Sequence, residues 1–191
     1  MCWKPPQSRA AFFIWRHLSL LSTVGYAADK ITLGKNNFAI KLDSINFDNK
    51  NTDDGVYVGA EGYKEIEKNL YLGAEVGYTS TDGKVTIYGA TVNSDTIFLP
   101  IEINLKYAVR IIDQLIIDFG IGGSYNYSKE EISGSSKDEW LFGGQGFGDI
   151  NVTIGKVFLG INAKIQFTDK GRDTGKNYSN QRIGGQIGVI F

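Results

Sequence analysis

Hydrophobic and polar positions alternate along much of this chain. In Lys156–Phe167 (KVFLGINAKIQF) every second residue from Val157 onward is apolar, and Asn162, Lys164 and Gln166 lie between them. A period of two predicts an extended strand with two unlike faces. The period alone leaves two interpretations open. The apolar face either packs inside a water-soluble β-protein or faces lipid around a barrel with a polar interior.

The same alternation recurs in eight runs. They cover residues 36–47, 55–65, 69–80, 95–108, 114–127, 140–154, 156–167 and 181–191. A strand that crosses a membrane at a tilt needs about 9–11 residues, and every run reaches that length. The sequence therefore predicts eight strands, each long enough to span a bilayer.

The connections between these runs alternate in length. Short connections cover 66–68, 109–113 and 155–156, and long polar ones cover 48–54, 81–94, 128–139 and 168–180. An up-and-down barrel with an even number of strands has its short turns at one end and its long loops at the other, as in outer-membrane barrels. The stretch 81–94 is itself strand-like, with Asp82-Gly83 as a hairpin signal, and is predicted to extend the wall beyond the membrane. The predicted fold is an all-β, eight-stranded antiparallel up-and-down transmembrane β-barrel.

The apolar face of these strands has the features of a lipid-facing surface. From about Leu70 onward few charged residues fall on it, as expected because Lys or Arg at mid-membrane costs about 2–4 kcal/mol. Aromatic residues on this face gather near the strand ends and predict a girdle at each rim. The girdle residues are Tyr78, Tyr107, Tyr125, Tyr127, Trp140, Phe142, Phe167 and Phe191.

The polar face is then predicted to fill the lumen. Its ionisable residues are Lys41, Asp43, Glu61, Glu75, Glu102, Lys106, Asp118, Asp149, Lys164 and Arg182. An eight-stranded barrel is only wide enough for side chains to fill it. These six acids and four bases are expected to pair in a structural network that plugs most of the interior. Pro100 lacks a backbone N–H, so a bulge or a local break in the ladder is expected there.

Length and composition suit one domain with a targeting segment. The chain has 191 residues and a formal charge of −1, which gives no basic surface for nucleic acid. Residues 1–27 are predicted to be a signal peptide, with Gly25-Tyr26-Ala27 as the cleavage pattern, although a disordered tail is the alternative. Residues 28–35 form a lead-in, and residues 36–191 form the barrel.

The chain has few residues that could act in catalysis or bind a metal. Met1, Cys2 and His17 are the only residues of their kinds, and all three lie inside the predicted signal segment. The predicted barrel thus lacks the histidine base that activates serine or water near neutral pH. A Ser–Lys dyad with Lys41, Lys106 or Lys164 remains formally open. The prediction is a non-enzymatic protein with no catalytic residue, cofactor or metal site.

Two segments resemble a known family. FLPIEINLKYA (Phe98–Ala108) followed by IIDFGIGGSYNY (Ile116–Tyr127) resembles a recurring strand pair of small bacterial surface barrels, the opacity-protein and OmpA/OmpX-like proteins. The final IGGQIGVIF, ending in Phe191, is similar to their C-terminal strand, which the barrel-assembly machinery recognises. The resemblance implies a bacterial outer-membrane location and explains Pro100 as a family feature.

The resemblance leaves the activity open, because such barrels host several functions. The expected function is to present surface loops for envelope integrity, adhesion or another surface interaction. The expected partners are outer-membrane lipid, the assembly machinery and an extracellular partner of the loops, and the barrel is expected to be a monomer. The alternatives are a narrow pore for small solutes or ions and a soluble periplasmic β-barrel that binds a lipid-like ligand.

Overall fold

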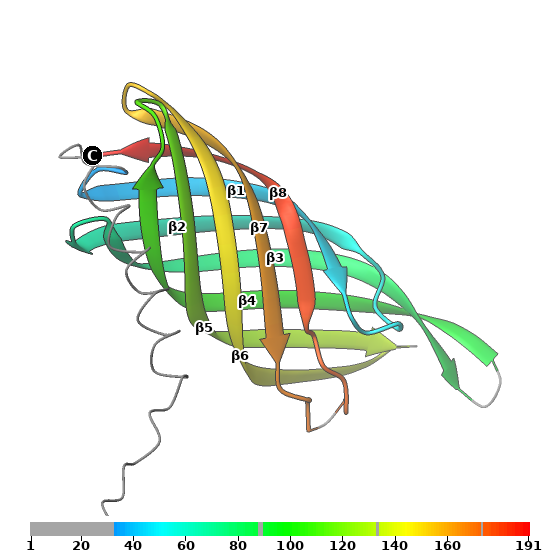
Figure 1. Cartoon of the computed structure of the whole chain (residues 1–191). Helices are drawn as coiled ribbons and strands as arrows, with labels where there is room; N and C mark the ends of the chain where they lie inside the picture. Colours follow the sequence, from blue (N-terminus) through cyan, green and yellow to red (C-terminus); the bar gives the residue numbers. More distant parts are fainter. Residues whose placement is uncertain (1–32, 88–89, 133, 173) are drawn as a thin grey trace, which may run out of the picture. The chain divides into compact units, whose positions relative to one another are not determined.

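Eight antiparallel strands form a closed barrel in the computed structural model, which describes residues 33–87, 90–132, 134–172 and 174–191 (Figure 1). The strands are β1 (Asn36–Phe47), β2 (Gly55–Glu67), β3 (Leu70–Ile87), β4 (Ala90–Arg110), β5 (Leu115–Ile132), β6 (Ser135–Ile154), β7 (Val157–Thr168) and β8 (Asn180–Ile190). Each strand pairs with its neighbour in sequence, and β8 pairs with β1. The predicted eight-stranded up-and-down barrel is confirmed. The predicted signal segment, 1–27, lies outside the described residues.

One end of the barrel, here called the turn end, has the short connections. The turn between β2 and β3 places Asn69 at φ 65°, and the turn between β6 and β7 places Gly155 at φ 64°. These are left-handed conformations, which Gly and Asn adopt most readily. The barrel also closes here, because Asn36 and Phe191 exchange backbone hydrogen bonds of 3.0 and 2.9 Å. The opposite end is called the loop end.

Two hairpins at the loop end differ from the prediction. The strand pairing of β3 with β4 continues to Ile87 and Ala90, so the wall is extended as predicted. Asp82-Gly83 is not the turn, however, because Asp82 pairs with Asp95 inside the ladder. Residues 128–139, expected to be a polar loop, mostly continue β5 and β6 as far as the Ile132–Ser135 pair. Polar residues form strand there because the backbone pairing of the wall propagates past the apolar segment.

Pro100 coincides with a local break in the ladder. The pairs Val76–Ile101 and Thr79–Phe98 are formed, whereas the two pairs expected between them are missing. Pairing with β5 runs without interruption through Pro100–Asn126. The predicted break is confirmed and no bulge accompanies it, because a missing N–H removes hydrogen bonding on one side only.

The strands are strongly tilted, as the register around the barrel shows. A row of paired residues starts at Asn37 near the turn end of β1 and returns to β1 at Phe47, near the loop end. Between these two residues it passes through Tyr63, Gly73, Asn104, Gly122, Gln145, Gln166 and Asn180. Each such row therefore climbs toward the loop end in the order β1 to β8. Closing a sheet into a barrel requires this stagger.

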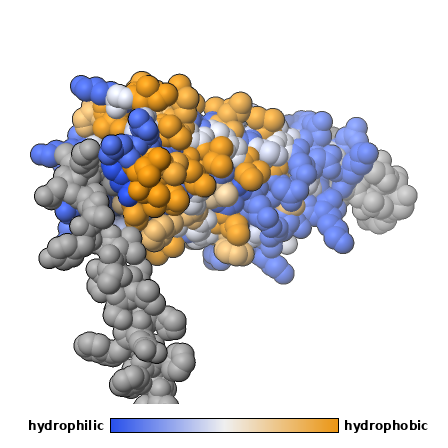
Figure 2. Space-filling view, turned by 45° about the horizontal axis from the view of Figure 1, so that its top comes forward, coloured by the Kyte–Doolittle hydropathy of each residue, from blue (hydrophilic) through white to orange (hydrophobic). Residues whose placement is uncertain are grey.

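The two faces of the wall separate apolar from ionisable side chains. Ile103 and Ile121 on the outer face are 65% and 68% exposed, whereas Glu102 on the inner face is fully buried. Figure 2 shows apolar residues gathered over one part of the wall and hydrophilic residues toward the loop end. The prediction that the apolar face lies outside is confirmed. Among the described residues, none forms a helix with the length and hydropathy of a membrane span.

Candidate functional site: the interior of the barrel

The interior is the part of the molecule where ionisable side chains converge. Alternation along each strand turns every second residue inward. All ten predicted lumenal residues are at most 4% exposed, and they are Lys41, Asp43, Glu61, Glu75, Glu102, Lys106, Asp118, Asp149, Lys164 and Arg182. They come from all eight strands.

Three carboxylates lie side by side on one wall. Glu61 on β2 pairs in register with Glu75 on β3, which pairs with Glu102 on β4. Like charges in directly opposed positions destabilise a sheet. The arrangement is stable because cations face these carboxylates. Lys164 on β7 and Arg182 on β8 reach across the lumen, and Lys41 comes from β1, the strand next to β2.

Glu75 is the centre of this ion-pair network. Its carboxylate accepts hydrogen bonds from Lys164 Nζ at 2.6 Å, Arg182 Nη1 at 3.3 Å and Lys41 Nζ at 3.4 Å. The hydroxyl of Tyr57 donates a further hydrogen bond of 2.7 Å to Oε1. Four donors around one buried carboxylate satisfy its charge without water.

The remaining cations link the other acids to this centre. Glu102 contacts Lys164 and Arg182, and Lys41 Nζ lies 2.7 Å from Glu61. Lys106 bridges Glu61 at 3.7 Å and Asp118 at 3.8 Å. The network is thus continuous across the barrel, and each of its lysines is paired with a carboxylate.

Aromatic rings support two of these cations. Lys106 Nζ lies 3.8 Å from the centre of the Tyr63 ring, and the Arg182 guanidinium lies 4.2 Å from that of Tyr57. Cation–π contacts of this kind are strongest where water is excluded. Sequence reasoning assigned no role to either tyrosine.

Asp43 and Asp149 stand apart from the ion pairs. Asp43 accepts a hydrogen bond of 3.0 Å from Asn162 Nδ2. Neither acid has a lysine or arginine within ion-pair distance among the described residues, although both are buried. No group of three or more His, Cys, Asp or Glu side chains in the described part of the chain has the arrangement of a metal site.

An apolar layer closes the lumen on the turn side of the network. Its buried residues are Leu33, Ala39, Tyr63, Tyr71, Ala108, Ile116, Phe147 and Phe158. Leu33 precedes β1 and is fully buried, and its N–H donates a hydrogen bond of 3.2 Å to the hydroxyl of Tyr71. The lead-in segment therefore contributes a side chain to this closure, which is called the turn-side seal.

A second apolar layer, the loop-side seal, closes the other end. It consists of Ile45, Phe47, Tyr57, Phe98, Leu141 and Tyr178. Tyr178 comes from the loop between β7 and β8, stacks on Phe98 at 5.9 Å and meets Phe47 edge-on at 6.3 Å. Burial raises the pKa of the Tyr178 hydroxyl to about 12, so the side chain stays neutral at physiological pH.

The same loop is tied to the extended hairpins by polar contacts. Lys176 forms an ion pair with Glu130 on β5, and the Thr174 hydroxyl donates a hydrogen bond to Glu139 on β6. The backbone N–H of Asp169 also donates to the carbonyl of Phe142 at 2.9 Å. These contacts hold Tyr178 over the mouth of the lumen.

Sequence reasoning missed the apolar side chains of both seals. On the polar face of the strands, large aromatic residues lie next to glycines. This combination is the feature of the sequence that could have predicted aromatic rings inside the lumen. A Cβ at Gly77 would lie 2.0 Å from the Tyr57 hydroxyl, and one at Gly120 would lie 2.4 Å from the Phe147 ring. These glycines leave the room that the rings occupy, an arrangement known from designed and natural sheets.

The predicted girdle residues lie on the outer face. Tyr78, Tyr107, Tyr125, Trp140, Phe142, Phe167 and Phe191 are between 38% and 68% exposed, and Tyr127 is half-buried. At the loop end, Tyr125 stacks on Trp140 with ring centres 4.5 Å apart, and Tyr127 also contacts Trp140. At the turn end, Tyr107 packs against Phe119.

Comparison with solved structures agrees with this architecture. The N-terminal β-barrel domain of Pseudomonas aeruginosa OprF aligns with a TM-score of 0.54 at 11% identity, over 83% of this chain and 99% of that domain. Ail, the attachment invasion locus protein of Yersinia pestis, in complex with the heparin analogue sucrose octasulfate, aligns with a TM-score of 0.49 at 10% identity, over 81% and 96%. No family model and no curated protein sequence matches the chain.

The fold is therefore that of a small outer-membrane β-barrel. At 11% identity the OprF alignment supports the fold and not an activity. It confirms the expected resemblance to the eight-stranded OmpA/OmpX-like barrels. Within that fold, the lumen of this chain holds a buried ion-pair network between two apolar seals.

Proposed function

We propose that this chain is a non-enzymatic integral protein of the bacterial outer membrane, whose sealed barrel anchors the segments at its loop end. The observation that carries the proposal is the closed lumen, with the ion-pair network centred on Glu75 between the two seals. A continuous water-filled path for ions or solutes needs a lumen that side chains leave open, as in larger barrels.

The outer face supports the membrane part of the proposal. Aliphatic side chains such as Ile103, Ile121 and Ile161 are more than half exposed along the wall. Exposed apolar surface of this extent destabilises a protein in water and matches the hydrocarbon interior of a bilayer. The inverse arrangement, a soluble barrel with an apolar ligand inside, has no support, because the interior is ionic.

The anchoring role rests on what lies beyond the apolar wall. The hairpins of β3–β4 and β5–β6 extend past it as paired strands, and the loop 169–179 is held against them. Such an ordered polar surface suits envelope integrity or contact with an extracellular partner. The signal function of residues 1–27, recognition of the strand ending at Phe191 by the assembly machinery, and a monomeric state belong to this proposal.

Two measurements test the proposal. The chain from Ala28 is refolded in detergent and run with and without boiling on an SDS gel, where a folded membrane barrel shifts in mobility. The wild type is then inserted into planar bilayers, where no discrete conductance steps are expected. Regular steps in the wild type would favour the narrow pore, and a soluble β-rich monomer in plain buffer would refute the membrane assignment.

A further inference from the structure

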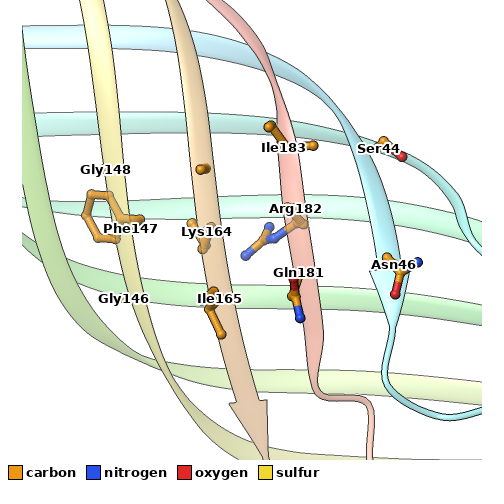
Figure 3. Close-up of a pocket in the computed structure, with 11 residues that line it drawn as sticks. Ser44, Asn46, Gly146, Phe147, Gly148, Lys164, Ile165, Gln181, Arg182 and Ile183 are labelled. Carbon is orange, nitrogen blue, oxygen red and sulfur yellow. The ribbon is translucent and has the colours of Figure 1, made fainter.

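The outer wall is not uniformly convex. A groove of about 670 Å³ crosses β6, β7, β8 and β1 on the outer face (Figure 3). It follows two neighbouring rows of paired residues. One row contains Gly146, Ile165, Gln181 and Asn46, and the other contains Gly148, Ala163, Ile183 and Ser44.

The groove exists because the residues at its β6 end have little or no side chain. A Cβ at Gly146 would meet no atom within 4 Å, so the space in front of this backbone is open. Gly148 and Ala163 continue the shallow floor, and Ile165 and Ile183 form apolar walls. The floor is therefore as apolar as the surrounding face but lies deeper.

The two ends of the groove differ in height and polarity. Each row climbs toward the loop end in the order β1 to β8 and on to β1. The glycine end of the groove on β6 is therefore closer to the turn end of the barrel, and the β1 end is closer to the loop end. At the higher end are the hydrogen-bonding side chains of Gln181, Asn46 and Ser44. An apolar trough that ends in polar groups near the membrane surface matches the shape and polarity of a lipid.

Charge at the higher end narrows the choice of lipid. The Nδ2 of Asn46 donates a hydrogen bond of 2.8 Å to the carboxylate of Asp54, which is exposed. The two cationic residues along the groove, Lys164 and Arg182, have their charged groups in the lumen with Glu75 and Glu102. The head end thus offers an anion and neutral donors, which suit an ammonium group and ester carbonyls better than a phosphorylated sugar.

We propose that this groove binds a glycerophospholipid with an ammonium headgroup. One acyl chain lies over Gly146, Gly148 and Ala163, the ester carbonyls accept hydrogen bonds from Gln181 and Ser44, and the ammonium group faces Asp54. The inference rests on the proposed membrane location. It names a lipid class and a position on the wall, whereas the proposed function requires only general contact with lipid.

The test measures lipid retention by native mass spectrometry of the folded barrel. The protein is titrated in detergent with phosphatidylethanolamine, phosphatidylglycerol, phosphatidylcholine or lipopolysaccharide. Ala163→Phe fills the groove, and Ala74→Phe is its matched control, because Ala74 is also exposed on the outer face but lies on β3. Asp54→Asn removes the anion at the head end without changing the trough.

Wild type and Ala74→Phe are expected to retain the two lipids with an ammonium headgroup, phosphatidylethanolamine and phosphatidylcholine, in preference to phosphatidylglycerol and lipopolysaccharide. Ala163→Phe should weaken this binding about tenfold, equivalent to about 1.4 kcal/mol. Asp54→Asn should lower retention of phosphatidylethanolamine but not of phosphatidylglycerol. If Ala163→Phe does not fold, Gly146→Leu fills the same groove from β6 and must give the same loss.

Equal lipid retention by Ala163→Phe and Ala74→Phe would refute the groove as the lipid-binding site. A preference for lipopolysaccharide or phosphatidylglycerol would refute the assignment of an ammonium headgroup. The heat-dependent gel shift is recorded for each variant. A wild type that shows the shift but no selective retention refutes only the groove. A wild type that never folds in detergent refutes the membrane assignment itself.

Discussion

The inner and outer faces of the same strands are held in place by different physics. On the inner face, Glu75 has four specific donors and tolerates no change of geometry without leaving a buried charge unpaired. On the outer face, Ile121 is 68% exposed and its surroundings require only that it be apolar. Neighbouring residues on one strand therefore differ in what a substitution removes. A substitution on the inner face removes specific hydrogen-bond and ion-pair partners, whereas one on the outer face removes an apolar surface that suits the surrounding hydrocarbon.

The substitution with the largest expected effect disrupts the ion-pair network of the lumen. Glu75→Ala leaves Lys41, Lys164 and Arg182 with fewer counter-charges in a sealed lumen, and removing one partner of a buried ion pair costs about 3–5 kcal/mol. The free energy of unfolding, measured with urea in phospholipid vesicles, should fall by that amount. A loss of less than about 1 kcal/mol would mean that water already screens these charges.

A charge on the outer face should cost somewhat less. Ile121→Arg places a cation against the hydrocarbon, at an expected cost of about 2–4 kcal/mol in the same vesicle measurement. Ile112→Arg is the matched control, because Ile112 is 60% exposed but lies in the turn between β4 and β5. Equal effects of the two substitutions would show that the band around Ile121 does not lie in the membrane.

The smallest expected effect concerns an ion pair outside the lumen. Lys129 Nζ lies 3.9 Å from Glu131 with side chains 38% and 51% exposed, and such pairs contribute about 0.2–1 kcal/mol. Lys129→Ala should change the free energy of unfolding by no more than this, and high salt should abolish the difference. An effect as large as that of Glu75→Ala would contradict the idea that the lumenal ion pairs contribute more to the free energy of unfolding because they are buried.

Much of the architecture follows from local patterns. Alternation in Lys156–Phe167 and in the other runs predicted the eight strands and their two faces, because a period of two depends only on backbone geometry. The scarcity of charge on the apolar face and the aromatic residues near its ends predicted that this face lies outside. Pro100 predicted the break in the ladder, because a missing N–H is a property of the residue itself. The Asp82-Gly83 turn was wrong, because pairing with β4 outweighed the local preference for a hairpin.

The side chains inside the lumen could be predicted from the sequence only in part. Parity along the strands placed the ten ionisable side chains on one face before any contact was known. It did not predict that Glu61, Glu75 and Glu102 would be adjacent, because this depends on the registers of two hairpins. It also missed the seals. Leu33 and Tyr178 come from outside the strands and reach the lumen only in the folded chain, and the only local sign of the strand residues such as Tyr57 was the glycines beside them.

The sequence by itself determined the number of strands, their two faces and the kinds of residue available to the interior, because each of these depends on neighbours in the chain. The tertiary structure decided which cation meets which carboxylate, how the lumen is closed, and that glycines on β6 lie in line with polar side chains on β1. Those relations join residues that are far apart in sequence. They are set by the stagger with which the sheet closes on itself.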